Sequence, residues 1–82
     1  MPELPTQVPW RRFVCVLRKL DYTPQKGKAG SARSFINPER IPNVVSFREP
    51  HPRQTLRRTM LREYLRKLLL SPDEFMQLLK DC

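Results

Sequence analysis

The sequence is poor in the residues that build most metal and cofactor sites. It holds two cysteines, two glycines and one histidine, His51. With a single histidine and no Cys-x-x-Cys pair, a structural zinc site lacks ligands. The glycines, Gly27 and Gly30, cannot supply the glycine-rich loops that bind nucleotide phosphates. The sequence therefore predicts no metal and no small-molecule cofactor.

Long apolar stretches are missing as well. No apolar run approaches the roughly 20 residues that a membrane-spanning helix needs, and the first five residues carry neither the basic nor the apolar region of a secretory signal. Two thiols, Cys15 and Cys82, also fall short of the dense disulfide framework of small secreted domains. We therefore expect a cytoplasmic protein with no membrane partner, whose two cysteines are free and reduced.

Positive charge is what the chain has in excess. Its 82 residues carry 16 Lys and Arg against 8 Asp and Glu, a formal charge of +8 with a pI near 10.4. Such an excess favours an anionic partner, which means nucleic acid, an acidic protein or a membrane surface. The length allows one small domain with a limited core, so a deep cavity between domains is not expected.

Apolar spacing predicts two longer helices. Over residues 9–20 apolar side chains recur at three- and four-residue steps, which is typical of one buried helix face. Residues 55–70 return to this spacing, and Thr55 or Thr59 is the expected capping residue at the start.

Between these helices the composition changes to that of strands. Residues 44–48 contain β-branched and aromatic side chains in alternation with others and are the clearest strand, and residues 32–36 have strand composition near their end. Residues 22–26 are compatible with a short additional strand. Residues 37–43 hold two prolines and two asparagines and are expected to form a loop. The order favours an α+β fold in which helices cover one face of a small antiparallel sheet.

The two ends of the chain differ in pattern. Residues 1–8 show little periodicity and are expected to form a flexible lead-in, so that a single domain spans residues 9–82. Ser71 and Glu74 have the spacing of a capping box, which predicts a short C-terminal helix.

Two basic segments are candidates for binding phosphate. The first combines cations, a glycine and a hydroxyl, which are groups that approach phosphate oxygens readily; these residues are Lys26, Lys28, Gly30, Ser31 and Arg33. The second is the basic set from Arg48 through Lys67. Its cations in the loop and at the helix start are favoured, because helix N-termini also attract phosphate; these residues are Arg53, Arg57 and Arg58. The alternatives are a solvated turn and an ordinary wet helix face.

His51 is the candidate catalytic residue. It lies between two prolines and beside cations, and an imidazole with an ordinary pKa of about 6.5 suits general acid–base work in RNA cleavage. The alternative is a surface histidine in a turn.

Taken in order, several short motifs resemble the HicA family, small mRNA-cleaving toxins of toxin–antitoxin pairs. The motifs are Gly30-Ser31-Ala32-Arg33-Ser34-Phe35, Asn37-Pro38, Val44-Val45-Ser46-Phe47, Glu49-Pro50-His51-Pro52, Leu56 and Leu70-Ser71-Pro72-Asp73-Glu74-Phe75. Each motif alone is weak, and their order and spacing carry the resemblance over residues 10–79.

The resemblance implies a double-stranded-RNA-binding-like fold, namely helix, three-stranded antiparallel sheet and helix, followed by the short C-terminal helix. It also implies a ribonuclease (mRNA interferase) that takes mRNA as substrate without metal or cofactor, as the toxin of a type II toxin–antitoxin pair. The implied protein partner is a HicB-like antitoxin that covers the active face. Two other functions stay open: a non-catalytic RNA-binding module, and a protein that binds an acidic partner.

One position departs from the family pattern. The family's catalytic histidine after Gly-Ser is replaced by Ala32, which cannot move a proton. Three explanations are open. The histidine was deliberately replaced because an active toxin is hard to express; or the subfamily naturally carries alanine and uses His51 instead; or the protein binds RNA, or its partner, without cutting.

Overall fold

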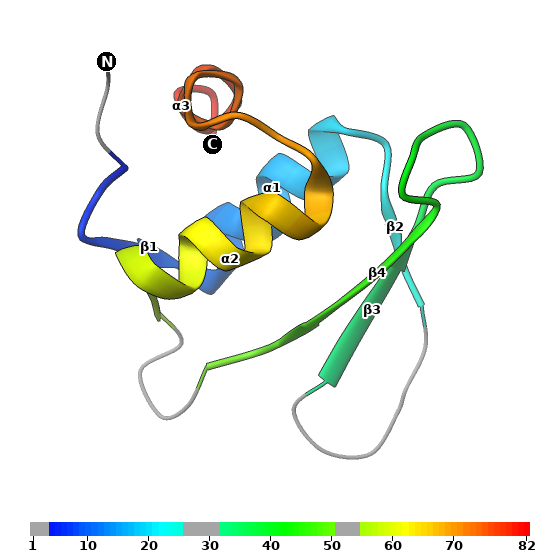
Figure 1. Ribbon diagram of the computed structural model, residues 1–82, viewed down its shortest axis with the longest axis horizontal. Helices are drawn as coiled ribbons and strands as arrows, with labels where there is room; N and C mark the ends of the chain where they lie inside the picture. Colours follow the sequence, from blue (N-terminus) through cyan, green and yellow to red (C-terminus); the bar gives the residue numbers. More distant parts are fainter. Residues whose placement is uncertain (1–3, 26–31, 51–54) are drawn as a thin grey trace.

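Two small antiparallel sheets and three helices make up the computed structural model, which describes residues 4–25, 32–50 and 55–82 (Figure 1). The fold is α+β, as predicted. The elements in chain order are β1 (Gln7–Pro9), α1 (Trp10–Lys19), β2 (Thr23–Pro24), β3 (Ala32–Ile36), β4 (Val44–Arg48), β5 (Thr55–Arg57), α2 (Arg58–Leu68) and α3 (Pro72–Leu79).

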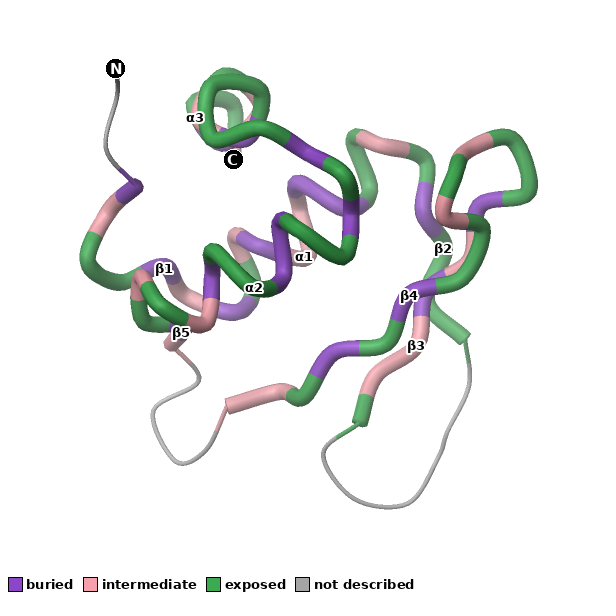
Figure 2. Tube along the Cα trace, viewed as in Figure 1, coloured by how far each residue is buried: buried purple, intermediate pink, exposed green. Residues whose placement is uncertain are grey.

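The larger sheet has the strand order β2-β3-β4, all antiparallel, and its β3 and β4 coincide with the strands predicted from composition. Buried and exposed residues alternate along β4 (Figure 2), because successive side chains of a strand point to opposite faces. Phe35, Val45 and Phe47 are buried on the inner face of the sheet. The outer face carries the residues between them, and none of the helices in the described ranges lies over it (Figure 1).

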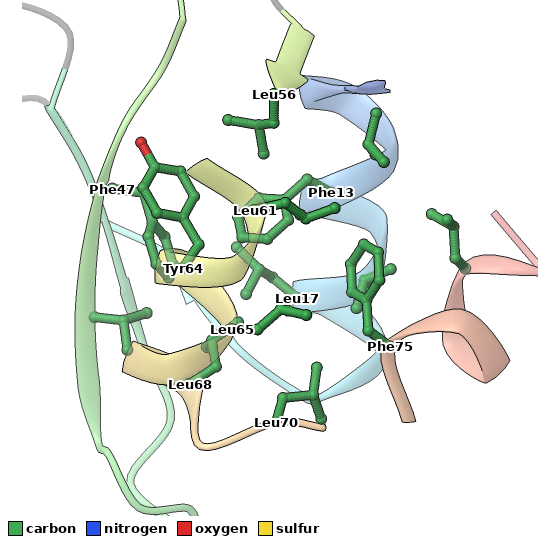
Figure 3. Packing of buried hydrophobic residues seen from close by; sticks show 14 of the residues in the cluster. Phe13, Leu17, Phe47, Leu56, Leu61, Tyr64, Leu65, Leu68, Leu70 and Phe75 are labelled. Carbon is green, nitrogen blue, oxygen red and sulfur yellow. The ribbon is translucent and has the colours of Figure 1, made fainter. Parts of the chain in front are cut away.

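The core lies between this inner face and the helices, and Phe13 of α1 is at its centre (Figure 3). The Phe13 ring stacks edge-on against Phe47 of β4, with 5.2 Å between ring centroids. It also contacts Tyr64 of α2 at 5.7 Å and Phe75 of α3 at 6.3 Å. One fully buried ring therefore joins the sheet to all three helices, and aromatic pairs of this geometry add to the gain from burial.

The loop between β3 and β4 is organised by one buried polar residue, Asn37. Its Nδ2 donates to the Leu20 carbonyl at the end of α1 at 2.8 Å, and its Oδ1 accepts from the Glu39 backbone N–H at 2.9 Å. These bonds satisfy the buried amide and tie the sheet to α1.

The C-terminal helix begins as predicted. The Ser71 side chain accepts from the Glu74 N–H, the Glu74 carboxylate accepts from the Ser71 N–H, and Pro72 occupies the first helical position. This capping box starts α3, which then buries Phe75 and Leu79. In the described part of the chain, no helix has the length and apolar character required to cross a bilayer.

The expectation of a flexible lead-in over residues 1–8 was wrong for its described part. Leu4 and Val8 are buried, and β1 pairs antiparallel with β5. The Arg58 N–H and its Nε donate to the carbonyls of Thr6 and Leu4 and hold this segment down. Three-residue strands leave almost no periodicity in a sequence, which is why the pattern did not reveal them.

The expected start of the long helix was also wrong. Thr55 lies in β5, Thr59 lies inside α2, and the N-cap is Arg57, which makes no side-chain cap. Pairing with β1 keeps residues 55–57 extended, and α2 begins only where that ladder ends.

The cysteines are not free, contrary to expectation. Cys15 of α1 and Cys82 form a disulfide across a sequence separation of 67 residues. The number of cysteines is visible in the sequence, but whether two of them lie close together in the fold is not. Here the packing of α3 beside α1 brings Cys15 and Cys82 together.

Candidate functional site: the outer face of the sheet

Ala32, which the resemblance to HicA toxins predicts to stand at their catalytic position, is an exposed residue at the start of β3. Its partner across the ladder is Arg48, the last residue of β4, whose side chain is exposed. Facing residues of an antiparallel pair have Cβ atoms roughly 5 Å apart. Ala32 therefore has an arginine as its direct neighbour on the outer face.

The rest of this outer face is a short ladder of small and polar side chains. Ser34 faces Ser46 one step along the ladder from Ala32, and Ile36 faces Val44 one step further. Hydroxyls and a guanidinium at the Ala32 end are donors for phosphate or ribose oxygens, whereas the other end is apolar. We call the four residues Ala32, Ser34, Ser46 and Arg48 the outer-face site.

Arg33, predicted to bind RNA, is not on this face, because it alternates with Ala32 and Ser34. Its Nε lies 3.0 Å from Glu49 Oε1, and its Nη1 donates to the Ala32 carbonyl at 3.1 Å. The Glu49 side chain is 13% exposed, so much of this arginine's charge is matched locally. Arg33 therefore braces the end of the sheet at which Arg48 lies.

The cations predicted at the helix start have different environments. Arg57 is exposed, at the junction of β5 and α2, and its side chain is available for an anion. Arg58 is half-buried, and its Nε is used to hold Leu4. Arg57 belongs to the smaller sheet of β1 and β5, whereas the outer-face site lies on the sheet of β2, β3 and β4.

Two residues of α2 that sequence reasoning did not assign to the site support the free edge of β4. The Tyr64 hydroxyl donates to the Arg48 carbonyl at 2.9 Å. The Lys67 Nζ lies 3.5 Å from the Ser46 carbonyl and about 6 Å from the ring centroids of Phe47 and Tyr64. These contacts occupy carbonyls that an edge strand otherwise exposes, and they fix the backbone that carries Arg48. Burial raises the pKa of the Tyr64 phenol above its usual value.

The helical spacing of Tyr64 and Lys67 was visible in the sequence, three positions apart on α2. Nothing in that spacing shows which strand they reach, because the contact depends on how α2 packs against β4.

The remaining predicted residues lie outside the described ranges, so their placement stays a prediction. They are Lys26, Lys28, Gly30, Ser31, His51 and Arg53. The two segments that contain them are attached to the site, since Ala32 follows the first directly and Pro50 precedes the second two residues after Arg48. Within residues 4–25, 32–50 and 55–82 no cluster of three or more His, Cys, Asp or Glu side chains is placed to hold a metal ion.

The described groups of the outer-face site can bind an anion by charge and hydrogen bonding. Imidazole is the side chain whose ordinary pKa suits proton transfer near neutral pH, and the chain has one, that of His51.

Comparison with known proteins returned no protein family, no curated protein and no solved structure that matches this chain. The resemblance to HicA toxins therefore stays a prediction that rests on the motifs alone.

Proposed function

We propose that this protein binds RNA on the outer-face site and acts as the toxin of a type II, HicA-like toxin–antitoxin pair. Its charge of +8 supports a polyanionic ligand. The order of its motifs and its helix–sheet–helix arrangement support the HicA resemblance. The observation that carries the proposal is the pairing of Ala32 with Arg48 at the end of a sheet face that none of the described helices covers.

The proposed chemistry is metal-independent cleavage of mRNA. The ribose 2′-hydroxyl attacks the adjacent phosphorus, the bond from that phosphorus to the 5′-oxygen of the next nucleotide breaks, and the departing 5′-oxygen takes up a proton from solvent. The products are a 2′,3′-cyclic phosphate and a 5′-hydroxyl end, so the substrate supplies its own nucleophile and the protein needs only to move protons and offset charge. His51 takes the proton from that hydroxyl as general base. Arg48 neutralises the phosphate oxygens, and the hydroxyls of Ser34 and Ser46 orient the backbone.

The proposed protein partner is a HicB-like antitoxin that covers the same face, and the proposed location is the cytoplasm, where mRNA is translated. Covering the outer-face site protects β3 and β4 from solvent. Hydrogen exchange of the backbone amides, compared between the free protein and the complex, measures this protection. Unchanged exchange in β3 and β4 would contradict the proposed binding face.

RNA binding is tested by replacing one arginine of the site and one outside it. Arg48→Gln removes an exposed charge from the outer-face site. Arg62→Gln removes an exposed charge from α2 and is the control. Lys67 of this helix contacts β4, and Arg62 lies about 140° around the helix axis from Lys67, so it points away from the sheet. Affinity for single-stranded RNA is measured over a range of salt concentrations.

Loss of one phosphate contact lowers the slope of log K against log salt by about 0.7. We expect this change in Arg48→Gln and an unchanged slope in Arg62→Gln. Equal effects in both variants indicate that only net charge matters and overturn the assignment of the site. A wild-type protein without RNA affinity at low salt overturns RNA binding itself and favours an acidic protein partner.

Cleavage is tested separately with Ala32→His and His51→Ala, assayed on mRNA and by growth arrest of cells that express the protein. Restoring an imidazole beside Arg48 is expected to raise cleavage, typically by a factor of 100 or more for a placed general base. His51→Ala is expected to abolish the mRNA cleavage that the wild-type protein shows. If neither variant changes cleavage, the catalytic proposal fails even where RNA binding persists.

A second candidate function is a non-catalytic RNA-binding module, and Ala32 is the observation that favours it. The methyl group leaves the donors of the outer-face site in place while it removes the proton-transfer group. This candidate predicts wild-type RNA affinity with no cleavage in any variant.

A further inference from the structure

A hollow of about 440 Å³ lies on the outward side of α1, away from the outer-face site. It is lined by Trp10, Arg11, Val14, Cys15 and Arg18. Arg11 and Arg18 are exposed, while Val14 and Cys15 are only partly exposed. The lining therefore combines two positive charges with a sulfur atom, a methyl-rich side chain and an indole.

The sulfur in this hollow belongs to the Cys15–Cys82 disulfide, and both of its cysteines are partly exposed. The disulfide therefore lies at the margin of the core, in residues that reach the surface, rather than inside it. Inside a packed core a disulfide is shielded from exchange, whereas an accessible one exchanges at a rate set by the attacking and leaving thiolates.

Positive charge surrounds Cys15 along α1. Arg11 precedes it by four residues and Arg18 follows it by three, and both spacings place side chains on the same helix face roughly 5–6 Å apart at Cβ. Lys19 also follows four residues later, and its Nζ lies 3.9 Å from Asp81, an exposed carboxylate next to Cys82. The negative charge of Asp81 beside Cys82 is thus partly neutralised by Lys19, while Arg11 and Arg18 line the hollow.

From this geometry we propose that the Cys15–Cys82 disulfide is a site of exchange with small anionic thiols of the glutathione class. The attacking thiolate RS⁻ bonds to Cys82 Sγ, and the bond between the two protein sulfurs breaks. The electron pair leaves on Cys15 Sγ, so a mixed disulfide at Cys82 and a thiolate at Cys15 are the products. One disulfide is exchanged for another, so no outside oxidant or reductant is needed.

The choice of sulfur follows from the leaving group. A thiolate leaves faster when its environment stabilises the negative charge, and neighbouring arginines do so for Cys15. The same positive charges attract an anionic thiol toward the disulfide, because the two bonded sulfurs lie well within the roughly 8–10 Å over which such charges act.

The exchange releases the end of the chain from α1 without removing α3. Phe75 and Leu79 remain buried in the core, and Arg12 Nη2 still donates to the Leu79 carbonyl at 3.1 Å. Loosening is therefore expected only in the turn that follows Leu79, residues 80–82.

The experiment compares two small thiols of opposite charge on the oxidised protein. Mercaptoethanesulfonate is the anionic probe and cysteamine the cationic one, with rates expressed per thiolate. Adducts are located by peptide mass spectrometry, and glutathione is then tested as the larger anionic thiol. The proteins are the wild type, Arg11→Gln/Arg18→Gln, and the charge-matched control Arg62→Gln/Arg66→Gln on α2.

We expect the anionic thiol to react faster with the wild type, with the adduct on Cys82. The anionic-to-cationic rate ratio should fall about two- to threefold for each α1 arginine removed, and high salt should remove the same preference. The α2 control should keep the wild-type ratio. Equal rates for the two thiols, an equal loss in the α2 control, an adduct on Cys15, or an oxidised protein without the Cys15–Cys82 bond would each overturn the proposal.

Discussion

Breaking the Cys15–Cys82 disulfide is expected to cost this domain a large part of its stability. The bond closes a loop with a sequence separation of 67 residues, nearly the whole chain. In the chain-entropy description, closing a loop of this length removes enough freedom from the unfolded state to stabilise the fold by about 4 kcal/mol at 25 °C. A domain of 82 residues has a total stability of roughly 4–12 kcal/mol, so reduction removes at least about a third of it even though the folded structure changes only near residues 80–82.

Urea titration with tryptophan fluorescence measures this effect, because the chain has one tryptophan and Trp10 is nearly buried in the core. The oxidised protein, the same protein with a reducing agent, and Cys82→Ser are compared. The last two should unfold alike and at lower urea than the oxidised form. Their m-values should also be larger, because an uncrosslinked chain exposes more surface on unfolding.

Cys82→Ser is the internal control, since the reducing agent has no disulfide to act on in that variant. A difference below about 1 kcal/mol between oxidised and reduced protein would refute the reasoning that the long loop controls stability. A shift of Cys82→Ser by the reducing agent would show that the reagent acts elsewhere.

Two further predictions concern contacts that only the folded structure reveals. Burial raises the folded pKa of Tyr64 above the ordinary value of 10.0, so its stabilising effect is complete below that pH and is lost as the pH rises through the folded pKa. Tyr64→Phe should lower the unfolding free energy by about 1 kcal/mol, because the hydrogen bond is lost. It should also flatten the decline of that free energy at alkaline pH, which urea titration at stepped pH measures. An unchanged decline would show that groups other than Tyr64 cause it. Val8→Ala should cost about 2 kcal/mol, because Val8 is 1% exposed, whereas Val44→Ala should change little, because Val44 is 54% exposed. Equal midpoint shifts in thermal melts of the two valine variants would show that the β1 segment does not contribute to the core.

Local pattern alone determined much of the secondary structure. The apolar spacing of α1, the alternation along β4 and the capping box of Ser71 and Glu74 depend on residues within one or two turns or one strand of each other, so the sequence contains the whole signal. The same holds for the positive charge that motivates an anionic ligand. The outer position of Ala32 and Ser34 also follows from alternation, once Phe35 is placed in the core.

Only the tertiary structure decided the pairings between distant segments. The β1–β5 ladder, the disulfide between Cys15 and Cys82 and the support of β4 by Tyr64 each join residues that are far apart in the chain. Residue types suggest that such groups need partners, but many partners have suitable chemistry. The choice among them is made when α1, α2 and the sheet pack around Phe13, because that packing sets which side chains come within reach of one another.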